Sequence, residues 1–255
     1  MAKEGFQAPS APVPPEASKD ASTLKLTLGG FLSQGNSRNL ALTGATDYFL
    51  RRSSNQFSAL AAVNYGRSAP ATGEPYVTTV ENYQARVRYD RFLAAGVAAF
   101  FSVSARRDRF QGLDLRLNLD PGVAYYFIDE KGHRLWAELG YDLQYDLRDQ
   151  DFIDVAAATG AGPIEESEVR HNVRVFAGYE NQLTDSLKFG AGLEYLQNVQ
   201  AAENARLNAD AALTAQLDQD FSVATTVSVK YDNNPLPGVE DTDVIMALNV
   251  VYTMN

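Results

Sequence analysis

Hydrophobic and polar residues alternate along most of this chain from Leu24 onward. In one clear example Leu207 and Ala209 share one face, while Asn208 between them takes the other. The stretch 221–232 repeats the pattern. A period of two places successive side chains on opposite faces of a β-strand. The pattern therefore predicts an all-β chain.

The alternating runs are long and even in number. Strands that cross a bilayer at a tilt need about 9–11 residues, whereas the usual strand has about five or six. Single-chain bacterial barrels have an even number of strands. The runs lie at 24–34, 38–50, 55–66, 77–90, 96–108, 113–128, 134–147, 166–180, 187–199, 204–217, 221–233 and 242–254. They predict a transmembrane antiparallel β-barrel of about twelve strands.

The connections between the runs alternate in length. If both termini lie in the periplasm, every second connection should be a short periplasmic turn and the others longer outer loops. The longest connections, 67–76, 148–165 and 234–241, all fall on the predicted outer side. The tight turn at Gly35-Asn36-Ser37 is the exception on that side. The order of connections supports a barrel in the bacterial outer membrane.

Residues 1–23 lack this alternation and are rich in Pro and Ala. Such a segment cannot bury enough apolar surface to order itself, so we expect a disordered periplasmic arm before a barrel domain at 24–255. A rigid tether or a docking peptide for a periplasmic partner is the alternative. No apolar signal-peptide core follows Met1, so either the protein is cytoplasmic or, as we expect, this is a mature form with an added initiator Met.

Composition narrows the function classes. The formal net charge is −10, and an acidic chain argues against a nucleic-acid partner. Two histidines and no cysteines make a dedicated transition-metal site or cofactor unexpected. Aromatic residues gather near both ends of the predicted strands, as in barrels whose rings lie at lipid headgroups. The expected partners are therefore outer-membrane lipid, lipopolysaccharide and a small solute.

Four motifs occur in order along the chain. They are Gly30-Phe31-Leu32-Ser33-Gln34-Gly35-Asn36-Ser37, Tyr89-Asp90-Arg91-Phe92, Arg107-Asp108-Arg109-Phe110-Gln111-Gly112-Leu113-Asp114-Leu115-Arg116 and Pro121-Gly122-Val123-Ala124-Tyr125-Tyr126-Phe127. This set resembles the family of salt-induced outer-membrane proteins catalogued as domain of unknown function 481. The resemblance covers everything after residue 23 and implies an outer-membrane barrel, with no established substrate or reaction. The ending Tyr252-Thr253-Met254-Asn255 departs from the usual terminal aromatic of barrel proteins.

Charged residues of both signs share the predicted inward face. Because they lie on consecutive strands, they could form a ladder of Arg–carboxylate pairs across the lumen. The candidates are Arg86, Arg88, Arg106, Asp108, Asp114, Arg116, Asp142, Asp146, Arg170 and Arg174. Two interpretations remain open: the pairs brace and plug a small barrel, or they form an eyelet that selects polar or anionic solutes.

An enzyme is not expected. His171 shares the outward phase of Val169 and Val173, but the adjacent strand offers no Ser and no orienting acid for a catalytic dyad. His133 falls in a predicted turn. The outer-loop acids Asp149, Asp151, Asp154, Glu165, Glu166 and Glu168 are typical of a solvated loop, with weak Ca²⁺ or Mg²⁺ binding as the alternative.

The leading hypothesis is a narrow passive channel for small polar or anionic solutes. The alternative is a non-conducting structural or docking barrel that acts through its outer loops or its N-terminal arm. An interfacial lipid hydrolase is third.

Overall fold

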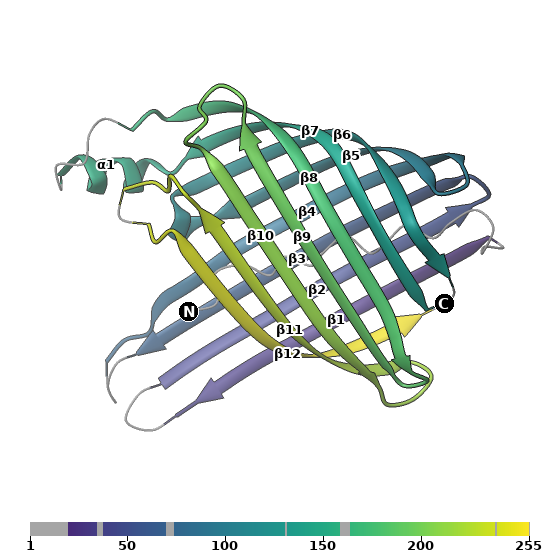
Figure 1. The fold of residues 1–255 in the computed structure, drawn as a ribbon. Coiled ribbons are helices and arrows are strands. Elements are labelled where there is room, and N and C mark those ends of the chain that lie inside the picture. Colours follow the sequence, from purple (N-terminus) through teal and green to yellow (C-terminus); the bar gives the residue numbers. More distant parts are fainter. Residues whose placement is uncertain are drawn as a thin grey trace.

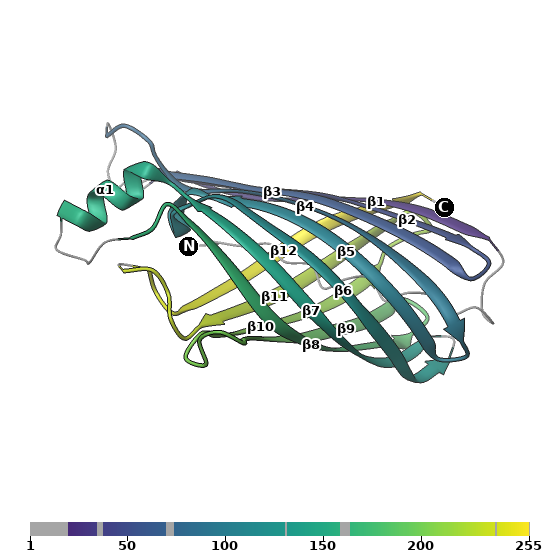
Figure 2. The ribbon, with the colours of Figure 1, turned by 90° about the horizontal axis from the view of Figure 1, so that it is seen from above.

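The chain forms a closed antiparallel barrel. The computed structural model describes residues 20–34, 38–69, 74–130, 132–158, 164–237 and 239–254, and twelve strands lie within them. Each strand pairs with its neighbours along the chain, and β1 (Ala21–Ser33) pairs with β12 (Thr242–Met254) to close the wall. Figures 1 and 2 show that the strands are long and tilted. The predicted fold class and strand number are confirmed.

Each strand coincides with a predicted run to within a few residues. The strands between the first and the last are β2 (Arg38–Arg52), β3 (Asn55–Ala69), β4 (Val77–Ala94), β5 (Val97–Asp108), β6 (Leu113–Glu130), β7 (His133–Arg148), β8 (Ser167–Thr184), β9 (Leu187–Asn198), β10 (Ala205–Gln216) and β11 (Phe221–Asp232). β1 begins at Ala21 rather than Leu24. The predicted arm, up to residue 19, and the tight turn at 35–37 lie outside the described residues.

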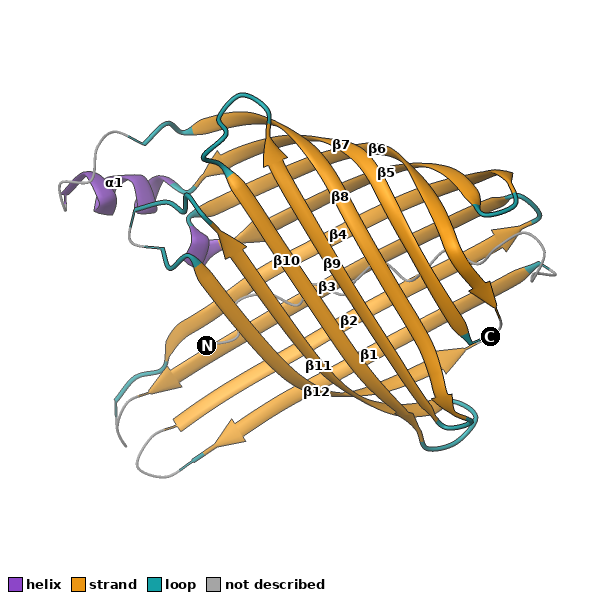
Figure 3. Ribbon diagram, viewed as in Figure 1, coloured by secondary structure: helices purple, strands orange, loops and turns teal. Residues whose placement is uncertain are grey.

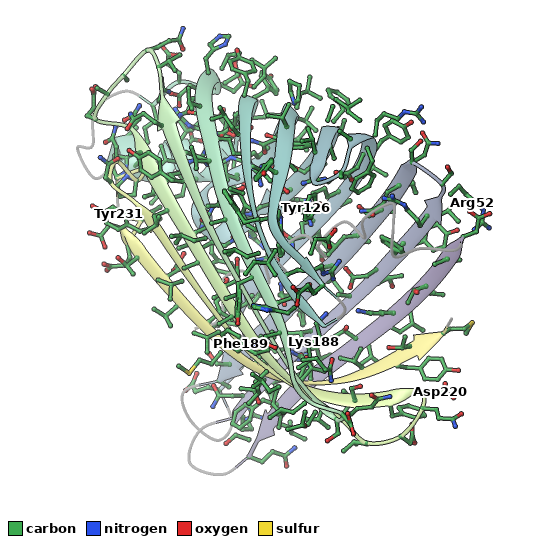
Figure 4. The ribbon with its side chains drawn as sticks, turned by 45° about the vertical axis from the view of Figure 1, so that its right-hand side comes forward. Arg52, Tyr126, Lys188, Phe189, Asp220 and Tyr231 are labelled. Carbon is green, nitrogen blue, oxygen red and sulfur yellow. The ribbon has the colours of Figure 1, made fainter. Side chains whose placement is uncertain are left out.

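The two ends of the barrel differ as the connections predict. In Figure 4, Arg52 and Asp220 mark the end with the short turns, and Tyr231 lies at the other end. In the β10–β11 turn, the backbone N–H groups of Asp220 and Phe221 donate to the Asp218 carboxylate over 2.9 and 2.7 Å. These hydrogen bonds favour the ionised form and hold the pKa of Asp218 below its usual range. We name this end the periplasmic end, after the orientation that the connections predict, and the opposite end the outer end.

The outer end carries a helix where the sequence predicts only a loop. Helix α1 (Gln150–Ala158) follows β7 and extends beyond the strands, as Figure 3 shows. Asp149 caps it, since its carboxylate accepts a hydrogen bond from the N–H of Phe152 over 3.1 Å. The Phe152 ring lies against Gly112, where the backbone is left-handed with a φ of +65°. No helix among the described residues is long and apolar enough to cross a membrane.

The wall reverses the distribution of side chains found in soluble proteins. Large apolar residues such as Leu139, Val175 and Leu248 are exposed on the outside, whereas Asp142 and Gln144 are buried inside. Outward aromatics near the strand ends are also exposed, among them Tyr125, Phe221, Tyr145 and Tyr231. This arrangement suits a wall that faces lipid.

The closing seam is short. β1 and β12 are paired only from Leu24–Met254 to Gly29–Asn249, whereas β1 and β2 are paired along all of β1, from Ala21–Arg51 to Ser33–Asn39. The outer part of β1 therefore lacks ladder partners on β12.

Candidate functional site

The predicted lumen charges gather on the inner wall of β4 to β8. Eight of the ten predicted residues line one cavity that opens toward the outer end: Arg86, Arg88, Arg106, Arg116, Asp142, Asp146, Arg170 and Arg174. A ninth, Asp108, is fully buried beside Arg106, whose Nη2 atom lies 3.0 Å from its carboxylate. Alternation along the strands explains why these side chains share one face.

Asp114 is an exception, and its predicted place in the lumen is wrong. Its carboxylate lies 3.4 Å from the guanidinium of Arg107, and both side chains are nearly half exposed. Register shifts between Leu113 and Leu115 on β6, and between Arg106 and Asp108 on β5, interrupt the alternation here. A bulge moves one residue to the other face, so simple counting fails beyond it.

The inner wall of β4 to β8, which we call the packed wall, has a chain of ion pairs around Glu138 at its centre. Arg88 donates to both carboxylate oxygens of Glu138 over 2.9 and 3.0 Å, and to Asp90 over 2.7 Å. Arg174 joins Glu138 to Glu194 through hydrogen bonds of 2.8 and 2.6 Å. All five side chains are buried. Glu138 therefore bridges two arginines that are 86 residues apart in sequence (174 − 88).

A second network lies nearer the outer end. Arg116 holds Asp146 with two parallel hydrogen bonds of 2.7 Å each. Asp142 accepts from the side-chain amides of Asn118 and Asn172, also over 2.7 Å. Such bidentate and fully paired contacts fix side-chain positions in a low-dielectric interior. The partners of these charged side chains hold them in the wall, so the side chains do not move toward a solute in the lumen.

At the outer rim, Arg148 and Arg170 both contact the carboxylate of Glu168. Arg106 also donates to Gln111, and Gln111 in turn donates to Asp243 on β12 over 3.0 Å. This last contact joins the packed wall to the opposite side of the barrel.

A block of buried aromatic rings fills the periplasmic part of the same wall. It consists of Phe92, Phe100, Tyr126, Trp136 and Phe176, together with Ala98 and Ala124. Tyr126, which Figure 4 labels, stacks on Trp136 with ring centroids 6.4 Å apart. The guanidinium of Arg88 lies 4.0 Å from the centroid of Phe100, which joins the rings to the ion-pair chain.

Two glycines make room for these rings. A Cβ atom at Gly178 would lie 2.1 Å from the ring of Trp136, and one at Gly122 would lie 2.4 Å from that of Phe100. The rings therefore lie directly against the backbone of the neighbouring strands. Sequence reasoning missed this block, although the inward phase of Trp136 and Phe176 could have shown it.

The other side of the lumen is open. A cavity of about 650 Å³ lies along β12, β1 and β2. Its lining is mostly small: Thr27, Ala41, Thr43, Ala45, Ala62, Ala212, Thr214, Ala224, Thr226, Ala247 and Thr253 are among its residues. On β12 it extends from Ile245 to Thr253, which is most of that strand. We call it the inner cavity, and the Arg-lined one, of about 200 Å³, the outer cavity.

The two cavities adjoin. On β3, Leu60 lines the outer cavity, and the next inward residue, Ala62, lines the inner one. On β10 the same holds for Asn208 and Asp210. Arg86 lies at this junction, because it lines the outer cavity and also interacts electrostatically with Asp210 of the inner one.

The histidines and the loop acids show no catalytic arrangement. His171 faces outward, and its Nδ1 atom is hydrogen-bonded to the hydroxyl of Tyr141. In the described part of the chain, no three His, Asp or Glu side chains are placed to hold a metal ion.

The chain is similar to several known proteins. A protein of Escherichia coli (strain K12), the uncharacterized protein YdiY, is 26% identical over 227 residues, which cover 88% of this chain and 81% of that protein. The solved structure of the NanC porin is 11% identical, with a TM-score of 0.51, and covers 91% of this chain and 100% of that one. An outer-membrane channel of Pseudomonas putida F1 is 12% identical, with a TM-score of 0.49 over 98% of this chain and 100% of the other.

The likeness to the NanC porin shows a shared fold, that of an outer-membrane β-barrel. A family model matches nearly the whole barrel, from residue 26 to residue 254. The resemblance inferred from the motifs is confirmed, and the chain belongs to the family described as "Protein of unknown function, DUF481".

Proposed function

We propose that this barrel lies in the outer membrane of a bacterium and acts as a narrow passive channel for small polar solutes, anions included. The observation that carries the proposal is the inner cavity, which extends along most of β12 and adjoins the outer cavity. Together they provide a path past the packed wall. The resemblance to a protein named as a porin supports the same function.

The size and lining of the path define the solute. About 650 Å³ lies within the range of pockets that hold small molecules, and it is too small for a folded chain. Hydroxyl groups of Thr27, Thr43 and Thr226 interrupt the small apolar residues of the lining. A solute with a few polar groups could exchange hydration for these hydroxyls without a strong binding site that would retain it.

The experiment is single-channel recording of the refolded barrel in planar bilayers, with folding checked by heat-modifiable gel mobility. We expect a small, steady conductance. Arg86→Ala should change the ion selectivity, because Arg86 lies where the cavities adjoin. Arg174→Ala should leave selectivity nearly unchanged, since Arg174 is already bound to Glu138 and Glu194. A folded barrel without conductance would contradict the proposal.

A silent barrel would favour the second candidate, a non-conducting structural or docking barrel. The packed aromatic block and the Glu138 network favour this candidate, because they close much of the cross-section. In that case the outer loops, with α1 at the outer end, would be the surface that contacts lipopolysaccharide or a protein partner. A periplasmic partner of the N-terminal arm is a further part of this candidate.

A further inference from the structure

Two lysines line the inner cavity, Lys25 on β1 and Lys188 on β9, four strands apart along the closed wall. Both side chains are exposed although they point inward, so they are open to the space in the lumen. Lys188, labelled in Figure 4, lies near the periplasmic start of its strand. The positive charge of Lys188 acts on the Lys25 ammonium group.

The acids nearby do not cancel this charge. Lys188 lies 2.8 Å from Glu180, but the same carboxylate oxygen also binds Arg134 over 2.5 Å. One carboxylate is therefore shared by two cations. Asp47 is opposite Lys25 in the strand register, yet no carboxylate of the described residues lies within 4.0 Å of the Lys25 ammonium.

The charges around this point sum to one excess positive charge. Three cations, Lys25, Lys188 and Arg134, are opposed by Asp47 and Glu180. Farther toward the outer end, the positive charge of Arg86 acts on Asp210. A single excess charge beside these two ammonium groups suits a singly charged anion better than a divalent one, which would leave a net negative charge in the lumen.

We propose that Lys25 and Lys188 form a site for small monovalent anions, such as chloride or a monocarboxylate, in the inner cavity. The inference rests on the proposed function insofar as the site makes the channel anion-selective. One unit charge about 4 Å from a permeating ion in a wet passage is worth about 1 kcal/mol, which favours an anion about fivefold and disfavours a cation about fivefold, so anions are preferred over cations by about 25-fold. Lysine offers a point charge without a fixed fork, so it attracts anions without selecting a planar group.

The test uses the full chain with Lys25→Gln, Lys188→Gln and both changes together. Arg91→Gln is the matched control, because it removes one positive charge from an exposed side chain that donates to Asn55 on the outer face. Reversal potentials are measured across gradients of potassium chloride, potassium acetate and potassium sulfate. We expect about 25-fold selectivity for chloride and acetate over potassium, less for sulfate, a ratio near one in the double variant, and no change in the control.

A conducting barrel that is cation-selective, or whose selectivity survives the double substitution, would overturn the anion site and leave the channel standing. A folded barrel without conductance would rule out the channel, and the anion site is then tested by a binding measurement. The folded protein in detergent should broaden the ¹H NMR line of acetate, and the double variant should lose this effect while Arg91→Gln keeps it. Equal broadening by all variants would overturn the site.

Discussion

The inner wall of this barrel has two halves that differ in side-chain volume. From β4 to β8, and on the outer part of β9, it carries arginines, acids and large aromatics, many of them buried. From the first residues of β9 through β10, β11, β12, β1 and β2 to β3 it carries mainly Ala, Thr, Ser and Gly. The large side chains of the first half fill their side of the lumen, and the small side chains of the second half leave the inner cavity.

The difference shows which charges can act on a solute. Arg88 and Arg174 are buried and bound on two sides, so they stabilise the wall. Lys25, in the small-residue half, is exposed to the cavity. A count of arginines on the inward face therefore says little about selectivity. What matters is which cations remain accessible beside the open path.

The largest expected effect of breaking the packed half comes from Glu138→Gln. It leaves two buried arginines without their shared carboxylate, and removing one partner of a buried pair typically costs about 3–5 kcal/mol. Urea unfolding of the refolded barrel should show that loss. Asp114→Asn is the control, because its pair with Arg107 is exposed and should contribute about 0–1 kcal/mol. Similar losses of unfolding free energy in both variants would contradict a buried Glu138 network that stabilises the wall.

A smaller effect is expected from adding one methyl group to each half. Gly178→Ala would push against the ring of Trp136, and overpacking of this kind costs about 1–3 kcal/mol. Gly190→Ala, which lines the inner cavity, would place its Cβ 4.0 Å from its nearest neighbour, the backbone oxygen of Tyr179. That change should stay within about 0.5 kcal/mol. If Gly178→Ala and Gly190→Ala lower the free energy of unfolding equally, the two halves are packed alike.

Strict alternation explains why the strands could be predicted from the sequence. It is a local signal, and it also assigned Arg86, Asp142 and Arg174 to the inner face. The prediction failed at Asp114 because a bulge depends on how neighbouring strands pair. Helix α1 was missed because its nine residues are stabilised by a cap at Asp149 and by the contact of Phe152 with Gly112.

The division into two halves could not be predicted in the same way. Ala212, Ala224 and Ala247 are visibly small and inward in the sequence, but their common location depends on the closure of β12 onto β1. Contacts across the lumen, such as that between Gln111 and Asp243, depend on strand tilt and stagger, which no single strand encodes. The short β1–β12 seam belongs to this same half.

The most direct test of the two-halves account is thiol labelling during conductance recording. The chain has no cysteine, so Ala212→Cys in the inner cavity and Ala124→Cys in the aromatic block each introduce a single thiol. A negatively charged methanethiosulfonate reagent should reduce the conductance of Ala212→Cys and leave Ala124→Cys unchanged. Block of Ala124→Cys with Ala212→Cys unaffected would place the path through the packed half and contradict the account.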